Sequence, residues 1–184
     1  MLEKMPARVE TERLMLRRPL ASDADAIFER YASDAEVVRF VGFPRHRSVA
    51  DSLAFIAHSD DQWTRWPCGP FLIESRADGR LLGGTGLTFE TPRRAMTGYV
   101  LAKDAWGHGY ATEALGAIVG LAEQFGPTRV YALCHTTHAP SAHVLEKCSF
   151  TLEGVLRRFA EFPNLQPGEP LDARCYSRIF GDRT

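Results

Sequence analysis

The chain has 184 residues, a length that predicts one domain able to bury its own core. Hydrophobic residues make up 45% of it and charged residues 24%, which excludes a mainly disordered, collagen-like or coiled-coil protein. The 22 Lys and Arg residues nearly balance the 23 Asp and Glu residues, for a formal net charge of -1. Broad electrostatic binding to nucleic acid or to an anionic membrane is therefore disfavoured, and neither is expected as a partner.

The first third of the chain is expected to form one strand and several helices. Residues 13–18 (RLMLRR) alternate apolar and polar side chains, as a half-buried strand does. A helix is expected after Ser22 or Asp23, and a second short helix over residues 34–40. A longer amphipathic helix is expected over residues 48–66, ended by the proline that follows.

The hydrophobic period then changes to that of strands. Residues 71–74 and 81–89 are expected to pair through a turn at Asp78-Gly79, and the glycines of the second strand indicate a bulge or a close backbone approach. Further strands are expected at residues 96–102, 129–134, 150–158 and 171–180. One helix between them is expected after residues 107–109, ended by Gly126-Pro127, and another from Pro140. Hairpins mixed with crossovers predict a mixed sheet with helices on its faces.

The cysteines and the N-terminus indicate a reducing, soluble compartment. The four cysteines form no C-x-x-C pair, so we expect reduced, buried thiols and no metal. Residues 1–10 (MLEKMPARVE) lack the apolar core of a signal peptide, and no run approaches the ~18 apolar residues of a membrane span. A cytoplasmic location is expected.

Residues 106–114 (WGHGYATEA) join a strand to an amphipathic helix through a glycine-rich turn. The first amides of a helix lack partners within it and carry the positive end of its dipole, and glycines let an anion approach them. The turn therefore predicts a diphosphate site built from backbone N–H groups. Thr112 excludes the dinucleotide pattern G-x-G-x-x-G, and no Gly-Lys-Ser/Thr is present for a P-loop. The alternative is a turn whose glycines only satisfy backbone geometry.

Residues 98–101 (GYVL) and 106–115 (WGHGYATEAL) together resemble the acetyl-coenzyme A motif of the GNAT N-acetyltransferases. The family pattern is Arg/Gln-x-x-Gly-x-Gly/Ala. Gly109 and Ala111 match its last two fixed positions, and Trp106 replaces the usual Arg or Gln.

Two further stretches extend the resemblance over nearly the whole chain. Residues 138–150 (HAPSAHVLEKCSF) are similar to the family segment Asn-x-x-Ser…Glu-Lys-x-Gly-Phe, with His138 in place of Asn and Ser149 in place of Gly. Residues 10–17 (ETERLMLR) are similar to the start of the ribosomal-protein alanine acetyltransferase (RimJ/RimL-like) branch. The resemblance implies a single-domain α+β GNAT fold, a mixed, mostly antiparallel sheet flanked by helices, over residues 10–181, with residues 1–9 as a tail.

The resemblance also implies direct transfer of an acetyl group from acetyl-CoA to a primary amine. The strand at 96–102 would splay from the strand at 129–134, and the pantetheine would lie in the gap. The residues expected to bind the cofactor are Val100, Leu101, Trp106, Gly107, His108, Gly109, Tyr110, Ala111, Thr112, His138 and Ser141.

Four residues are candidates for the chemistry. The Leu101 N–H would polarise the thioester carbonyl. Glu90 or His135 would accept the proton of the amine. Several family members protonate the leaving thiolate with a tyrosine, but the equivalent residue here is Leu145. Ser141 could donate instead, with capping of its helix as the alternative role.

Three functions remain open from the sequence. The first is an enzyme that acetylates a protein N-terminus, a peptide or a small amine, with the loop at residues 163–170 over the acceptor and a homodimer possible. The second is an acyl-CoA-binding module without turnover, an alternative that the departures at Trp106, His138 and Leu145 keep open. The third is a nucleotide-binding protein.

Overall fold

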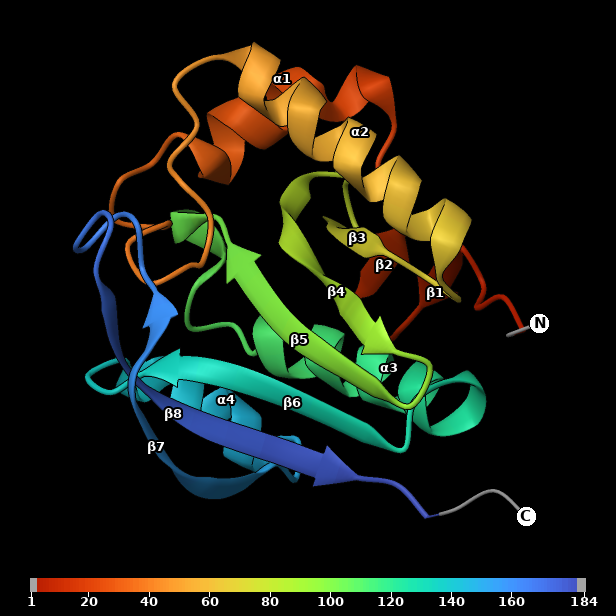
Figure 1. Ribbon diagram of the computed structural model, residues 1–184. Coiled ribbons are helices and arrows are strands. Elements are labelled where there is room, and N and C mark those ends of the chain that lie inside the picture. The colour runs from red at the N-terminus through yellow and green to blue at the C-terminus, as the bar shows by residue number, and fades with distance from the viewer. Residues whose placement is uncertain (1–2, 182–184) are drawn as a thin grey trace.

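The computed structural model describes residues 3–181, and one eight-stranded sheet runs through it with helices on both faces (Figure 1). The strands follow the order β1-β2-β3-β4-β5-β6-β8-β7, and every neighbouring pair is antiparallel except β5 and β6. The strands are β1 (Arg8–Glu10), β2 (Leu14–Arg17), β3 (Pro70–Ser75), β4 (Leu81–Thr91), β5 (Arg94–Leu101), β6 (Arg129–His135), β7 (Thr151–Glu161) and β8 (Pro170–Ile179). The predicted mixed sheet is confirmed.

Four α-helices lie within residues 3–181 and cover the sheet in two layers. They are α1 (Ala24–Ile27), α2 (Val49–Arg65), α3 (Tyr110–Phe125) and α4 (Ala139–Lys147). A 3-10 turn at Ala21–Asp23 and a π-helical turn at Phe28–Ala32 flank α1, and a 3-10 turn at Lys103–Ala105 follows β5. Helices α1 and α2 lie over one face of the sheet, and α3 and α4 lie over the other (Figure 1).

The long helices begin and end where the sequence predicts. The Ser48 N–H donates to the Asp51 carboxylate at 3.1 Å, which closes the first turn of α2. Gly109 precedes α3 in the left-handed conformation, with φ of 78°, and Gly126 ends that helix.

The predicted short helix over residues 34–40 is wrong. The segment forms hydrogen-bonded turns, with the Asp34 side chain accepting the N–H of Glu36 at 2.8 Å. Phe40 lies in a stacked contact with His138, with ring centroids 4.4 Å apart. A short segment has little helical stability of its own, so this tertiary contact and the Asp34 turn decide its conformation.

The N-terminal segment expected to be a tail is packed on the domain. Lys4 Nζ donates to three carbonyls at the end of α2, those of Trp63, Thr64 and Trp66, at 2.6, 3.0 and 2.7 Å. The Met5 side chain is only 3% exposed and belongs to the main core. A cation at a helix C-terminus and a buried thioether both stabilise this arrangement, so the segment from Lys4 onward is part of the fold.

Two glycines of β4 allow the close backbone approach that the sequence indicates. A Cβ at Gly83 would lie 2.0 Å from the Val100 carbonyl oxygen on β5, and one at Gly86 would lie 2.9 Å from the Pro70 Cα on β3. Any side chain at Gly83 would therefore displace β5. The end of β5 is held in place by this tight contact.

The sheet has a gap between β5 and β6. These strands pair in parallel at three positions only, which are Arg94 with Arg129, Ala95 with Val130, and Met96 with Tyr131. Beyond Met96 they diverge toward their C-terminal ends (Figure 1), while β6 stays paired with β8 as far as His135. The splay that the resemblance implies is thus present, at the C-terminal end of β5.

Candidate active site

The main chain of Leu101 faces the gap. Hydrogen-bonded and non-hydrogen-bonded pairs alternate along an antiparallel ladder. The Ala102 N–H donates to the Leu82 carbonyl at 2.7 Å, so the neighbouring Gly83–Leu101 pair is a non-hydrogen-bonded one. The N–H and C=O of Leu101 therefore point away from β4, toward the side that β6 has left. Val100 belongs to a hydrogen-bonded pair, and its amide faces β4 instead.

Trp106 fixes the carbonyl of that same residue. Its indole Nε1 donates to the Leu101 oxygen at 2.8 Å, while 42% of the residue stays exposed. The side chain that stands where the family pattern has Arg or Gln thus contacts the end of β5 rather than extending into solvent. Within residues 3–181, the N–H of Leu101 is therefore the main-chain group at the end of β5 that has no hydrogen-bond partner.

The turn before α3 presents a row of open amides. Gly107 and Gly109 have φ of 77° and 78°, in the region where glycine is favoured. Within residues 3–181, no backbone N–H from Gly107 to Thr112 donates to a protein oxygen, and the first that does is that of Glu113, to the Gly109 carbonyl at 3.1 Å. The turn is exposed, so these donors are accessible at the positive end of a sixteen-residue helix.

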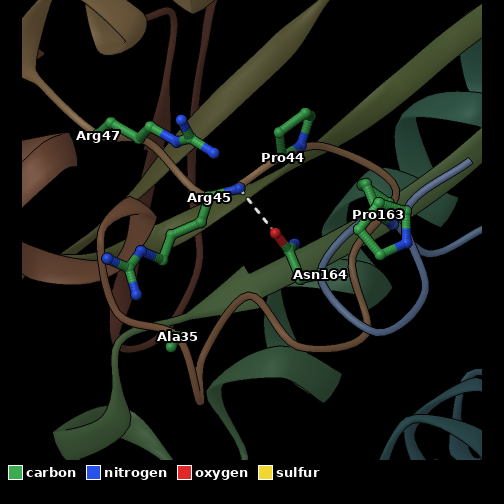
Figure 2. A pocket seen from close by; sticks show the side chains of 7 residues that line it. Ala35, Pro44, Arg45, Arg47, Pro163 and Asn164 are labelled. Atoms are coloured by element: carbon green, nitrogen blue, oxygen red, sulfur yellow. Dashed lines mark hydrogen bonds between the residues drawn. The ribbon is translucent and has the colours of Figure 1, made fainter.

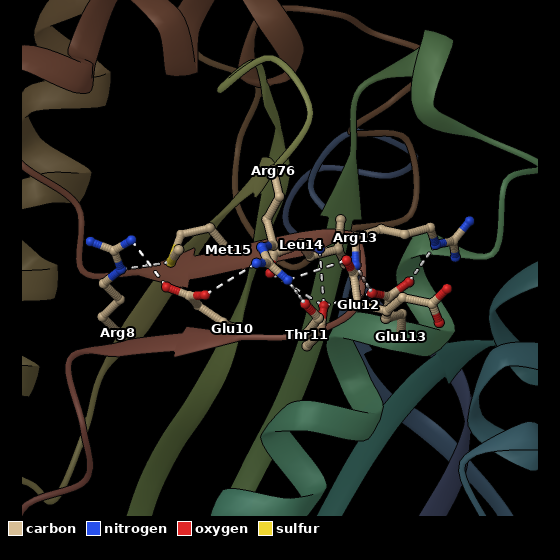
Figure 3. A network of polar contacts seen from close by, with 9 residues as sticks. All are labelled: Arg8, Glu10, Thr11, Glu12, Arg13, Leu14, Met15, Arg76 and Glu113. Carbon is tan, nitrogen blue, oxygen red and sulfur yellow. Dashed lines mark hydrogen bonds and ion pairs between the residues drawn. The ribbon is translucent and has the colours of Figure 1, made fainter.

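A polar network holds this turn against the β1–β2 hairpin (Figure 3). The Glu113 carboxylate accepts from the Thr11 hydroxyl at 2.6 Å, from the Arg13 N–H at 2.8 Å and from Arg13 Nε at 2.7 Å. Arg13 Nη1 donates to the His108 carbonyl at 2.9 Å, and its guanidinium lies 4.7 Å from the Tyr110 ring centroid. Burial raises the pKa of Glu113, but the hydrogen bonds from Thr11 and Arg13 outweigh it and the net pKa is lowered. The charged pair keeps the His108 carbonyl turned toward Arg13.

Tyr99 and Ser141 join the two sides of the gap. The Tyr99 hydroxyl, on β5, lies 2.9 Å from both the carbonyl oxygen and Oγ of Ser141, near the start of α4. Burial raises the pKa of Tyr99, so the hydroxyl stays protonated at neutral pH. His138 occupies the N-cap position of α4, and Ser141 Oγ bonds Tyr99 rather than a helix-end amide. Leu145 is 1% exposed and packs in the core.

His135 and His138 lie at the C-terminal end of β6 against Phe40. The Phe40 ring is 5.2 Å from the His135 ring and 4.4 Å from that of His138. Burial, and then the positive charge of Arg39, lower the pKa of His135, while burial and then His135 lower that of His138. The Thr137 N–H donates to His135 Nδ1 at 3.3 Å, so the neutral ring carries its proton on Nε2.

Glu90, near the end of β4, lies beside the start of β5, where β5 and β6 still pair. Its carboxylate accepts from Arg94 Nε at 2.6 Å and from the Tyr131 hydroxyl at 2.5 Å. Since Met96 and Tyr131 form the last pair before the gap, Glu90 is not brought together with Leu101, Ser141 and His135. Its two partners hold it as part of the closed end of the sheet.

Two contacts of this site escaped the sequence interpretation. Tyr99 was visible within the GYVL motif, and strand alternation alone could have placed its side chain on the same face as that of Leu101. Arg13 and Glu113 are 100 residues apart in the sequence, and no local pattern indicates that they are in contact. Both additions lie next to groups that the sequence did indicate.

The described residues, 3–181, hold neither a metal-binding cluster nor a membrane-spanning helix. Within residues 3–181, no three His, Cys, Asp or Glu side chains gather as a metal site would need. All four cysteines are free and buried. None of the helices in that range combines the length and apolarity that a bilayer-spanning segment needs.

Known proteins resemble this chain over most of its length. The family model for the acetyltransferase (GNAT) domain matches residues 13–151. The uncharacterized N-acetyltransferase YoaA of Bacillus subtilis (strain 168) is 31% identical over 179 residues, which cover 93% of this chain and 96% of YoaA.

Solved structures with the same fold include two acetyltransferases bound to cofactor. One is the microcin C7 self-immunity acetyltransferase MccE in complex with acetyl-CoA and AMP, with a TM-score of 0.80 at 20% identity, covering 96% of this chain and 98% of that one. The other is the ribosomal L7/L12 alpha-N-protein acetyltransferase RimL in complex with coenzyme A, with a TM-score of 0.78 at 20% identity, covering 97% and 98%. Given the match of the family model over most of the chain, this protein belongs to the GNAT acetyltransferase family and is an N-acetyltransferase.

Proposed function

We propose that this protein transfers an acetyl group from acetyl-CoA to a primary amine by direct attack within a ternary complex. The observation that carries the proposal is the row of unpaired amides from Gly107 to Thr112 beside the open edge of β5. Those amides bind the diphosphate without a lysine, because the helix dipole and the free N–H groups supply the positive potential. Acetyl-CoA supplies the activated acetyl group.

The gap between the strands binds the rest of the cofactor. A thin amide-containing chain laid along the free edge of β5 meets the main-chain groups of Tyr99 and Leu101, which point away from β4. The Leu101 N–H donates to the oxygen of the reacting carbonyl, where negative charge develops. Val100 contributes its side chain to the wall, because its amide is engaged with Gly84.

The amine must lose a proton to react, and His135 is the proposed acceptor of it. Because Nδ1 is the accepting nitrogen and Thr137 Oγ1 lies 2.9 Å from it, the proton passes from the amine to Thr137 and from Thr137 to Nδ1. The nitrogen forms a bond to the acetyl carbon as the carbon–sulfur bond breaks. Ser141 gives its proton to the leaving thiolate and regains one from solvent, to which His135 releases the proton it accepted, while the hydrogen bond between Tyr99 and Ser141 positions the Ser141 hydroxyl.

The acceptor is an amine on a protein N-terminus, a peptide or a small molecule. The RimL structure is named for an α-N-protein acetyltransferase of ribosomal L7/L12 and supports the first of these. An acyl-CoA-binding module without turnover is the second candidate, because Trp106, His138 and Leu145 depart from the family pattern.

Two measurements on the purified chain separate these functions. Isothermal titration calorimetry with CoA tests the turn, and a Gly109→Val variant, which places a β-branched residue at φ of 78°, is expected to lose binding. Release of free thiol from acetyl-CoA across a panel of peptides and amines tests turnover. CoA binding without thiol release on any acceptor would contradict the transferase and favour the binding module. Failure of the wild-type chain to bind CoA would contradict both.

A further inference from the structure

A cavity of about 640 Å³ lies between the segment of residues 33–48 and the loop of residues 163–170. Its lining is formed by Ala35 together with two arginines, three prolines and one asparagine: Arg45, Arg47, Pro44, Pro163, Pro167 and Asn164. Figure 2 shows the two arginines extending from one segment, with Pro163 and Asn164 on the loop opposite. A cavity of this size accommodates a small molecule or a few residues of a peptide.

The side chain of Asn164 links the two walls of the cavity by hydrogen bonds. Its Oδ1 accepts the Arg45 backbone N–H at 2.8 Å, and its Nδ2 donates to the carbonyls of Val38 and Phe43 at 2.7 and 2.9 Å. One side chain thus makes three hydrogen bonds to a segment about 120 residues away in the sequence. The prolines restrict the backbone further, so the cavity is formed before any ligand binds.

Two of the residues that line the cavity, Arg45 and Arg47, are positively charged. Residues 37–50 hold three arginines and one histidine and no Asp or Glu, in a chain whose net charge is -1. Within residues 3–181, the guanidinium groups of Arg45 and Arg47 make neither an ion pair nor a hydrogen bond. The loop opposite, residues 162–168, carries no charge.

Two carboxylates close to the cavity in the sequence, Glu36 and Asp51, already have other partners. Glu36 is ion-paired with Lys103, at the end of β5. Asp51 accepts the backbone N–H groups of Arg47 and Ser48 at 2.7 and 3.1 Å, which lower its pKa. None of the seven lining residues is acidic, and two are arginines, so the charge of the lining itself is positive.

The same segment lies across the mouth of the gap in the sheet. The Glu36–Lys103 pair ties it to the end of β5, and the stack of Phe40 on His138 ties it to the end of β6. The cavity is on this segment, so it adjoins the opening through which an acceptor must reach the Leu101 N–H. An acceptor held there extends from the cavity toward the reacting carbonyl.

We infer that this cavity is an anion subsite, in which Arg45 and Arg47 bind a carboxylate or phosphate group carried by the acceptor at a distance from its reactive amine. Guanidinium groups bind both anions through paired N–H donors. The inference rests on the proposed function, and it narrows the acceptor to amines that carry negative charge. A polyamine would be repelled by the same two side chains.

The kinetic test uses two hexapeptides that share a free α-amine and differ only in carrying four glutamates or four glutamines. Wild-type protein is expected to show a KM at least tenfold lower for the glutamate peptide, and added salt should reduce that difference. The double variant Arg45→Gln, Arg47→Gln should abolish it, leaving the KM for acetyl-CoA unchanged. The backbone N–H of Arg45, which binds Asn164, is retained in that variant.

The matched control is Arg65→Gln, which removes an exposed arginine on α2 paired with Asp61 at 2.8 Å. This variant should keep the full preference for the glutamate peptide. Equal KM values for the two peptides in the wild type, or a preference that survives in the double variant, would overturn the inference.

A binding measurement separates this inference from the proposed function. Fluorescence anisotropy of both peptides, labelled at their C-termini, is measured on protein saturated with CoA. Arginine-dependent binding of the glutamate peptide without acetylation supports the subsite while contradicting the transferase. Acetylation with no difference between the peptides overturns the subsite and leaves the transferase intact. Displacement by O-phosphoethanolamine assigns the subsite to small phosphate-bearing acceptors, and lack of displacement assigns it to carboxylates of a peptide.

Discussion

The indole N–H of Trp106 donates to the carbonyl oxygen of Leu101 at 2.8 Å, across the 3-10 turn that follows β5. The carbonyl oxygen of Leu101 is thus bound to a side chain, while the N–H of the same residue stays open toward the gap between β5 and β6. The position that carries Arg or Gln in the family pattern acts here on the geometry of the strand end. This assigns Trp106 a positioning role.

Replacing Trp106 with Phe removes this hydrogen bond. A net loss of about 1 kcal/mol corresponds to about a fivefold reduction in kcat/KM for acetyl-CoA. Trp106→Gln keeps a donor of the family type and should recover part of the rate. Steady-state thiol release measures both variants, and equal rates for Phe and Gln would contradict the role of the hydrogen bond.

Ser141→Ala removes the proposed proton donor to the leaving thiolate. We expect kcat to fall by about 10²-fold with the KM for acetyl-CoA little changed, since general-acid contributions begin near this size. Tyr99→Phe leaves Ser141 in place and should cost less. Thermal unfolding of both variants checks that the fold persists. An unchanged kcat in Ser141→Ala would assign that hydroxyl to structure alone.

The pKa of His135 lies below that of a free histidine, because burial and then the Arg39 charge disfavour the imidazolium. The base form is therefore present at neutral pH and is lost as the pH falls through this lowered pKa. We expect kcat to decline on the acid side with a midpoint below 6.5, the ordinary pKa of histidine. Arg39→Gln removes one cause of the shift, so its acid limb should move to higher pH. A pH–rate profile that is identical in the variant would contradict this assignment.

Ser149 is a non-glycine residue in the left-handed region, with φ of 62°, immediately after α4. The Phe150 N–H donates to the Leu145 carbonyl and the Ser149 N–H to the Glu146 carbonyl, both at 3.0 Å, which is the Schellman arrangement. Glycine adopts this conformation without the steric cost of a Cβ. Ser149→Gly should raise the free energy of unfolding by up to about 1 kcal/mol, or about 2–4 °C in Tm. A lower Tm would contradict the strain argument.

The Glu153 carboxylate links β7 to β8 and, beyond it, to β6. Hydrogen bonds from Arg129 at 2.5 and 2.7 Å and from Ser177 at 2.6 Å lower the pKa of its carboxyl from 4.5 to about 2. Because the folded pKa lies below the unfolded one, this stabilisation is present above pH 4.5 and is lost as the pH falls toward 2. The difference in Tm between wild type and Glu153→Gln should shrink over that window. Glu12→Gln, on an exposed turn, should show no such trend.

The sequence predicted what depends on local period and backbone. The two-residue alternation of β2 and β6, the end of α3 at Gly126-Pro127 and the close approach at Gly83 each follow from short-range patterns. The open amides after Gly107 follow from glycine conformation and helix polarity in the same way. The parallel gap between β5 and β6 came from the family resemblance rather than from any pattern.

What the sequence missed depends on contacts between distant residues. Asn164 binds carbonyls more than 120 residues away. Phe40, predicted to be helical, lies in a turn and stacks on His138. Met5 is buried although its segment has no strong apolar pattern. In each case a tertiary contact decides the conformation, and a single sequence carries no signal that identifies the partner.

The three residue pairs between β5 and β6 form the seam that joins two antiparallel blocks, β1 to β5 and β6 with β8 and β7. Any molecule that spans the unpaired edges beyond Met96 bridges the blocks and acts as a substitute strand. A bound ligand should therefore slow amide hydrogen exchange along this seam more than elsewhere in the sheet, because the site that receives the ligand is also the junction between the two blocks.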